Sequence, residues 1–97
     1  MEQIICLSGW GQSHDSIELS LDEKIKSLYK IKSIDYLKHS SFESFINDLS
    51  DVKNPVAVIG WSLGGQLAIR LCELKILNPA ILFLIAPPFQ LVKDNRI

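Results

Sequence analysis

The sequence lacks an excess of charge of either sign. Its 97 residues contain 10 Lys and Arg against 11 Asp and Glu, which gives a formal net charge of −1. The basic residues are scattered along the chain and are not interleaved with aromatic ones. Because nucleic acids and anionic membranes are bound mainly through clustered positive charge, we expect neither as a partner.

Cysteine is scarce, and long apolar segments are absent. Cys6 and Cys72 fall within apolar patterns, so we expect small buried side chains and neither a disulfide nor a metal site. The longest apolar run, residues 80–86, is far shorter than the ~20 residues that span a bilayer. Met1-Glu2-Gln3 lacks the basic opening of a signal peptide. These absences predict a cytoplasmic protein without a membrane segment.

The order of elements predicts an α/β fold in a single domain. Strand-like runs alternate with helical patterns, and these runs cover residues 3–8, 31–37, 55–60 and 80–86. The apolar positions expected on the intervening helices are Ile17, Leu21, Ile25 and Leu28, then Phe42, Phe45, Ile46 and Leu49, then Leu67, Ala68, Leu71, Cys72 and Leu74. A capping-box pattern, Ser40 to Glu43, opens the second of these helices. Such alternation forms a parallel sheet with helices on both faces, and the polar run 31–37 belongs near its edge.

The most informative segment is Gly60-Trp61-Ser62-Leu63-Gly64-Gly65, which lies between the apolar run 56–59 and a helical pattern. A G-x-S-x-G motif between a strand and a helix is typical of a nucleophile elbow, which exposes the Ser hydroxyl on a sharp turn. Gly60 and Gly64 are expected there because side chains would crowd the turn. The alternative is an ordinary strand-to-helix turn that contains a serine.

A second motif, Ser8-Gly9-Trp10-Gly11, follows the apolar run at residues 4–7. Acyl-transfer sites of this architecture take one oxyanion donor from the N–H after the nucleophile and another from a loop after an earlier strand. Here these donors would be the backbone N–H groups of Leu63 and Trp10. The alternative is a glycine-rich turn in which Trp10 serves only as a hydrophobic plug.

Together these residues resemble those of the α/β-hydrolases. The combination of S-G-W-G with G-W-S-L-G-G is similar to that of the pimeloyl-ACP methyl ester carboxylesterases of biotin synthesis, and Trp10 and Trp61 narrow the resemblance to this group. The resemblance covers roughly residues 3–90 and corresponds to the first half of a typical member. It implies a three-layer hydrolase-like parallel sheet, truncated to about four strands in the order two, one, three, four. One difference is Ser8, where most members have a structural His.

The resemblance also implies a function, that of a serine esterase. The intact family enzyme hydrolyses the methyl ester of an acyl chain that is carried on acyl carrier protein. By this resemblance Ser62 is the acylated nucleophile, Trp10 and Leu63 are the oxyanion donors, and the Trp10 ring forms one wall of the acyl pocket. No cofactor or metal is implied.

The sequence lacks a base for the nucleophile. A Ser hydroxyl needs a neighbouring base oriented by a carboxylate, and on this fold the chain order is Ser, acid, His. His14 and His39 both precede Ser62, and no His follows it. We interpret His14 as an exposed residue at the start of a helix, His39 as a solvated loop residue, and Asp94 as a polar tail residue. Residues 1–97 are therefore expected to form a partial hydrolase domain without the cap, acid and His, with little activity alone.

Two interpretations remain open, and with them the question whether the chain is an enzyme. In one, it is a fragment of a carboxylesterase that is inactive alone or is completed by a second chain carrying the acid and the base. In the other, it is a small non-catalytic α/β binding protein that retains the hydrolase fold. Downstream genomic sequence encoding a late Asp and His would favour the first.

The fourth predicted strand is expected to form an exposed sheet edge. Residues 81–85 are wholly apolar, and in the hydrolase topology another parallel strand lies on their outer side. The dozen or so residues after them are too few for a crossover connection and a strand. An uncharged edge invites pairing with another chain. We therefore expect low solubility, self-association through residues 81–85, or a complementing chain.

Overall fold

The four predicted strands are present and form one all-parallel sheet. A computed structural model describes residues 1–52 and 54–86. The elements are β1 (Gln3–Leu7), α1 (Ser16–Ser20), α2 (Glu23–Leu28), β2 (Lys30–Ser33), the 3-10 helix η1 (Tyr36–Lys38), α3 (Phe42–Asp48), β3 (Ala57–Trp61), α4 (Leu63–Glu73) and β4 (Ile81–Ile85). The strand order is β2-β1-β3-β4, as predicted. Our interpretation of Asp94 concerns a residue outside the described ranges.

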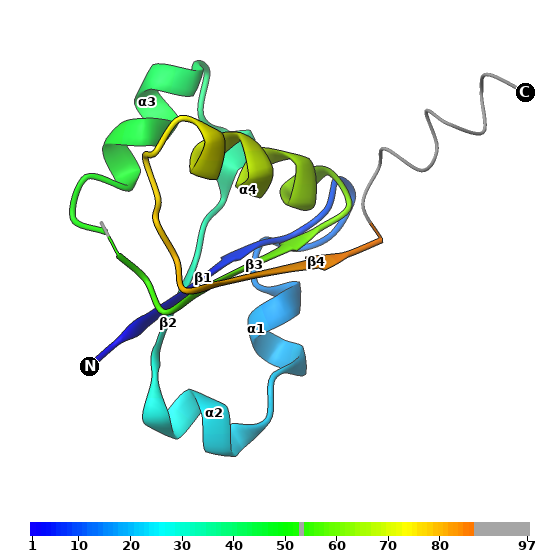
Figure 1. The fold of residues 1–97 in the computed structure, drawn as a ribbon. Helices are drawn as coiled ribbons and strands as arrows, with labels where there is room; N and C mark the ends of the chain where they lie inside the picture. The colour runs from blue at the N-terminus through cyan, green and yellow to red at the C-terminus, as the bar shows by residue number, and fades with distance from the viewer. Residues whose placement is uncertain (53, 87–97) are drawn as a thin grey trace, which may run out of the picture.

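The sheet is covered by helices on both faces, which is an α/β arrangement. Figure 1 shows α1 and α2 on one face and α3 and α4 on the other. The connection from β1 to β2 therefore covers one face, and the connection from β3 to β4 covers the opposite face. Because every strand runs in the same direction, all carboxyl ends meet at one edge of the sheet.

The core divides into two clusters because alternate residues of a strand face opposite sides. On β1, Ile5 and Leu7 pack under α3 and α4, whereas Ile4 and Cys6 pack with Ile17 of α1. Other members of the larger cluster are Ile34, Phe45, Leu49, Val52, Val58, Ala68, Leu71 and Leu77. β1 is thus buried on both sides, as its continuous apolar sequence predicts.

Three of the predicted element boundaries differ from those in the structure. The expected single helix through Ile17 and Leu28 is divided at Leu21, whose backbone is extended, and the Asp22 side chain caps the N-terminus of α2. The strand predicted at residues 31–37 ends at Ser33, and η1 follows it. The N-cap of α3 is Ser41, whose side chain accepts a hydrogen bond from the Ser44 N–H, so the predicted cap at Ser40 was one residue early.

Candidate active site

Ser62 lies between the end of β3 and the first turn of α4, at the carboxyl edge of the sheet. Its backbone angles are φ 55° and ψ −116°. Side-chain-bearing residues rarely adopt a positive φ, and such strain costs on the order of 1–3 kcal/mol. It persists only where the surrounding structure imposes it, and it concentrates at functional sites. The predicted nucleophile is therefore the strained residue of this turn.

Hydrogen bonds from two elements hold the strained backbone. The Ser62 N–H donates to the carbonyl of Ile85 on β4 at 2.8 Å. The Ser62 carbonyl accepts from the N–H groups of Gly65 and Gln66 in α4, at 2.9 and 3.2 Å. The turn is therefore fixed by the neighbouring strand and by the helix that follows it.

The glycines of the elbow are required by close approach of the backbone. A Cβ atom at Gly60 would lie 2.6 Å from the Cα of Gly65, and a Cβ atom at Gly64 would overlap the carbonyl oxygen of Leu7. This confirms that side chains would crowd the turn. The backbone strain, however, is at Ser62, because the described glycine with a positive φ is Gly11.

The loop after β1 lies directly against the elbow. A Cβ atom at Gly9 would lie 3.1 Å from the Trp61 carbonyl oxygen and 3.3 Å from the Ser62 Cβ. Gly11 adopts φ +84°, and a side chain there would meet no atom within 4 Å. The loop therefore needs Gly9 for contact with Ser62 and Gly11 for its backbone conformation.

The backbone N–H groups of this region differ in whether they have a protein acceptor. The N–H of Gly9 donates to Oε1 of Gln12 at 2.7 Å. By contrast, within the ranges 1–52 and 54–86, the N–H groups of Trp10 and Leu63 donate to no protein acceptor. Leu63 is also the first residue of α4, whose positive end favours negative charge. That these two groups converge on one oxyanion position stays a prediction.

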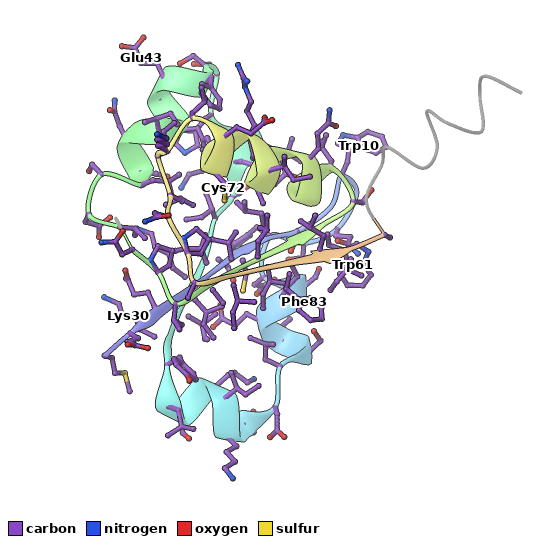
Figure 2. All side chains as sticks on the ribbon, in the orientation of Figure 1. Trp10, Lys30, Glu43, Trp61, Cys72 and Phe83 are labelled. Carbon is purple, nitrogen blue, oxygen red and sulfur yellow. The ribbon has the colours of Figure 1, made fainter. Side chains whose placement is uncertain are left out.

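The two tryptophans do not share one site. The Trp10 side chain is 76% exposed, so it is not the buried plug of our alternative interpretation. Trp61 is half-buried and packs with the Ile4 and Cys6 cluster on the α1 face. Figure 2 shows the two rings well apart, with Trp61 near Phe83. Only the backbone of Trp10 remains a direct component of the candidate oxyanion site.

The two histidines differ in exposure and in their contacts. His14 is exposed before α1, as predicted. The interpretation of His39 as a solvated loop residue was wrong, because its side chain is only 11% exposed. Its Nδ1 lies 2.9 Å from the Ser44 Oγ, and its Nε2 lies 2.7 Å from an Asp48 oxygen. Both ring nitrogens are thus occupied by α3, and neither is available to take a proton from Ser62.

Sequence reasoning missed the side chains that hold the loop after β1. The Tyr36 hydroxyl donates to the Ser8 carbonyl at 2.5 Å, and the buried Ser8 hydroxyl donates to the His14 carbonyl at 3.2 Å. Burial raises the pKa of Tyr36, which keeps its hydroxyl protonated as a donor. Ser8 thus has a defined structural contact in this loop. The separation of Tyr36 from Ser8 in the sequence left no local signal for this contact.

An apolar groove of about 530 Å³ begins at Leu63, the residue after Ser62, and the sequence did not predict it. It lies over α4, η1 and the start of α3, and its lining residues are Tyr36, Leu37, Phe42, Leu63, Gln66, Leu67 and Arg70. Leu63 directly follows Ser62, so one end of the groove is adjacent to the elbow. The Trp10 ring is not part of this lining. The predicted role of that ring as an acyl-pocket wall therefore does not apply to this groove.

Cys6 is buried in the core cluster with Ile4 and Ile17, as expected, whereas Cys72, which we also expected to be buried, is only half-buried. Burial, with a smaller effect of the Glu18 charge, raises the pKa of Cys6 to about 12, and burial raises the pKa of Cys72. Both cysteines are free thiols.

Within the described residues, no group of His, Cys, Asp and Glu side chains is arranged to hold a metal ion. In the same ranges no helix has the length and apolar character needed to cross a membrane.

Comparisons of this chain with protein-family models, with curated proteins and with solved structures gave no match.

Proposed function

We propose that this chain carries the nucleophile and the oxyanion-binding part of a carboxylic ester hydrolase with an α/β-hydrolase fold. The main support is the backbone of Ser62, a strained non-glycine residue at a strand-to-helix turn. The contact of Gly9 with Ser62 supports it further, because it brings the loop after β1 beside the nucleophile. The sheet order agrees with the order that the family resemblance implies.

The proposed reaction is acyl transfer to Ser62. The Ser62 Oγ attacks the ester carbonyl carbon, and the carbonyl oxygen gains negative charge that the N–H groups of Leu63 and Trp10 stabilise. The alcohol then leaves with a proton, and water releases the acyl group in a second step. A base must accept the Ser62 proton in the first step. Because α3 occupies His39, we propose that this base is a group other than His39, which reaches Ser62 at the carboxyl ends of the strands and does not pair with β4.

The finer part of the proposal concerns the substrate. The groove beside Leu63 has an apolar lining that includes Phe42 and Leu67, and such a lining suits an acyl chain. A methyl ester of an acyl chain on acyl carrier protein, as in biotin synthesis, fits this chemistry. This choice of substrate rests on the family resemblance. The groove supports only the acyl chain of the substrate.

Fluorophosphonate labelling with an external base tests the proposed nucleophile. The chain is incubated with an alkyl fluorophosphonate in increasing imidazole, and the modified peptide is identified by mass spectrometry. We expect phosphonylation at Ser62 that increases with imidazole, because imidazole supplies the missing base. Ser62→Ala should lose the adduct, whereas Ser44→Ala, which removes a serine hydrogen-bonded to His39, should retain it. Labelling spread equally over the serines, or confined to Ser44, would contradict the proposal.

A second candidate function is a non-catalytic binding protein. The observation that favours it is the engagement of both His39 nitrogens by α3, which removes His39 as a base for Ser62. In that case Ser62 stays unlabelled at every imidazole concentration. A fatty acid would still bind the groove, and Leu67→Lys would abolish that binding.

A further inference from the structure

The two edges of the sheet differ in charge. The edge strand β2 carries Lys30 and Lys32, and Lys32 pairs with Asp51. The other edge strand, β4, reads Ile-Leu-Phe-Leu-Ile, and its first three side chains are exposed. Charged side chains on an edge strand oppose pairing with another chain, whereas an uncharged apolar edge invites it. Only the β4 edge is therefore suited to pairing.

Two hydrogen bonds define which backbone groups of β4 point outward. The Ile81 N–H donates to the Val56 carbonyl at 3.1 Å, and the Ile85 carbonyl accepts from the Ser62 N–H at 2.8 Å. Ile81 and Ile85 thus direct their backbone groups toward β3, and by alternation so does Phe83. The N–H and C=O groups of Leu82 and Leu84 face away from β3. Within the described residues, no strand pairs with that outer side.

We propose that β4 pairs antiparallel with β4 of a second copy of this chain, about a two-fold axis at Phe83. In this register Leu82 lies opposite Leu84 of the second copy, and each pair exchanges both of its backbone hydrogen bonds. Phe83 lies opposite Phe83 of the second copy in a non-hydrogen-bonded pair, where side chains approach most closely. The proposed dimer therefore satisfies the outward-facing groups of the edge.

The composition of β4 favours a second copy as the occupant. The strand is self-complementary, because in the antiparallel register every cross-strand pair joins two apolar side chains and no charges face each other. An aromatic pair at the centre adds to the stability of such a ladder. Pairing of β4 with β2 of another copy would place Lys30 and Lys32 against an apolar strand, which disfavours an open chain of copies. A closed dimer follows.

The exposed aromatic side chain of β4 belongs to this surface. Phe83 is 58% exposed, and Figure 2 shows it on the α1 side of the sheet, near Trp61. Ile81 is 56% exposed and lies on the same face, two residues earlier. Two-fold pairing brings the two copies of Phe83 together at the dimer centre and leaves the copies of Ile81 far apart.

Sedimentation of the unchanged chain and of two matched lysine variants tests the dimer. At tens of micromolar we expect a dimer for the unchanged chain and a monomer for Phe83→Lys, with circular dichroism verifying that the variant stays folded. Leu28→Lys on α2 is the control, because Leu28 has the same 58% exposure and lies away from β4. It should remain a dimer. A monomeric unchanged chain, an open series of larger species, or a dimer unaffected by Phe83→Lys would each overturn the proposal.

Cysteine cross-linking tests the register. In a Cys72→Ser background, Phe83→Cys should form an interchain disulfide on mild oxidation, because facing residues of such a pair lie within the Cα distance that a disulfide spans. Ile81→Cys, almost equally exposed, should stay reduced, since its counterpart lies several residues along the strand. Equal cross-linking at both positions, or none at Phe83→Cys, would contradict the two-fold register. Neither experiment depends on the reactivity of Ser62, so the dimer and the proposed function are tested separately.

Discussion

The backbone strain at Ser62 predicts that replacing this residue by glycine increases stability and abolishes reactivity. Glycine adopts a positive φ freely, so Ser62→Gly removes strain of about 1–3 kcal/mol and adds roughly 0.5–1 kcal/mol of entropy loss on folding. We expect the variant to be more stable than the unchanged chain by about 1 kcal/mol in urea denaturation, and to lose fluorophosphonate labelling.

Ser50→Gly is the matched control for this change. Ser50 is an exposed serine that is not among the residues with positive φ, so its replacement only adds entropy loss and should lower stability. Equal destabilisation by Ser62→Gly and Ser50→Gly would mean that the elbow serine is not strained.

The buried thiol of Cys6 predicts a loss of stability at alkaline pH. Its pKa is raised to about 12 from the reference value of 9.0, so the unfolded chain releases this proton before the folded protein does. The folded state therefore binds more protons above pH 9, and the free energy of unfolding decreases as pH rises from 9 toward 12. The decrease is about 1.4 kcal/mol for each pH unit in this window.

Urea denaturation between pH 8 and pH 10.5 measures the effect. Cys6→Ala should be less stable at pH 8, because it leaves a cavity beside Ile4 and Ile17, but its stability should depend less on pH. Cys72→Ala is the comparison, since its thiol is only half-buried and should change the slope less. If the free energy of unfolding of Cys6→Ala decreased with pH as steeply as that of the unchanged chain, the loss of stability at alkaline pH would come from other groups.

Among the elements, α3 carries a side-chain contact that distinguishes a structural histidine from a catalytic one. His39 joins the end of η1 to Ser44 and Asp48 of α3, and its ring packs 6.0 Å from that of Phe45. Loss of such partly buried hydrogen bonds costs about 1–2 kcal/mol. We expect His39→Ala to lower stability by this amount and to leave the labelling of Ser62 in imidazole unchanged.

Asp48→Asn provides the comparison for His39→Ala. It keeps a hydrogen-bonding oxygen beside the imidazole and should cost less stability, with the same labelling of Ser62. A loss of labelling in His39→Ala while the fold persists would instead show that His39 serves Ser62.

The elements themselves were predictable where burial imposes a pattern. β1 and β3 are apolar runs because helices cover both of their faces, and the sequence shows this directly. The division between α1 and α2 was not predictable from periodicity, because Ile17, Leu21, Ile25 and Leu28 keep helical spacing across it. The Asp22 cap decides the division locally, and a capping side chain stabilises a new helix start by ~1 kcal/mol.

At the scale of the whole molecule, contacts between distant segments limited the prediction of the site. The G-x-S-x-G motif predicted the turn at Ser62 and its need for glycines, because such a turn requires these residue types at fixed spacing. The groove over α4 and the bond from Tyr36 to Ser8 join segments far apart in the sequence. Only the fold brings these residues together, so no local pattern indicates them.

Hydrogen exchange along β4 gives a prediction that concerns the whole assembly. The Ile81 N–H bonds within the sheet, so its exchange should be slow at any chain concentration at which the fold is intact. The N–H groups of Leu82 and Leu84 face the outer edge and gain partners only in the proposed dimer. Their protection should therefore decrease on dilution through the dissociation range.

The Val58 amide of the central strand β3 serves as the internal reference, because its protection depends on the fold alone. Phe83→Lys should show fast exchange at Leu82 and Leu84 at every concentration, with Val58 still protected. Protection of Leu82 and Leu84 that survives dilution to monomer would mean that residues of the same chain cover this edge. If the protection of the Leu82 and Leu84 amides depends on chain concentration while that of Ile81 does not, the edge is paired with a second copy. If their protection does not depend on concentration, the same chain covers the edge.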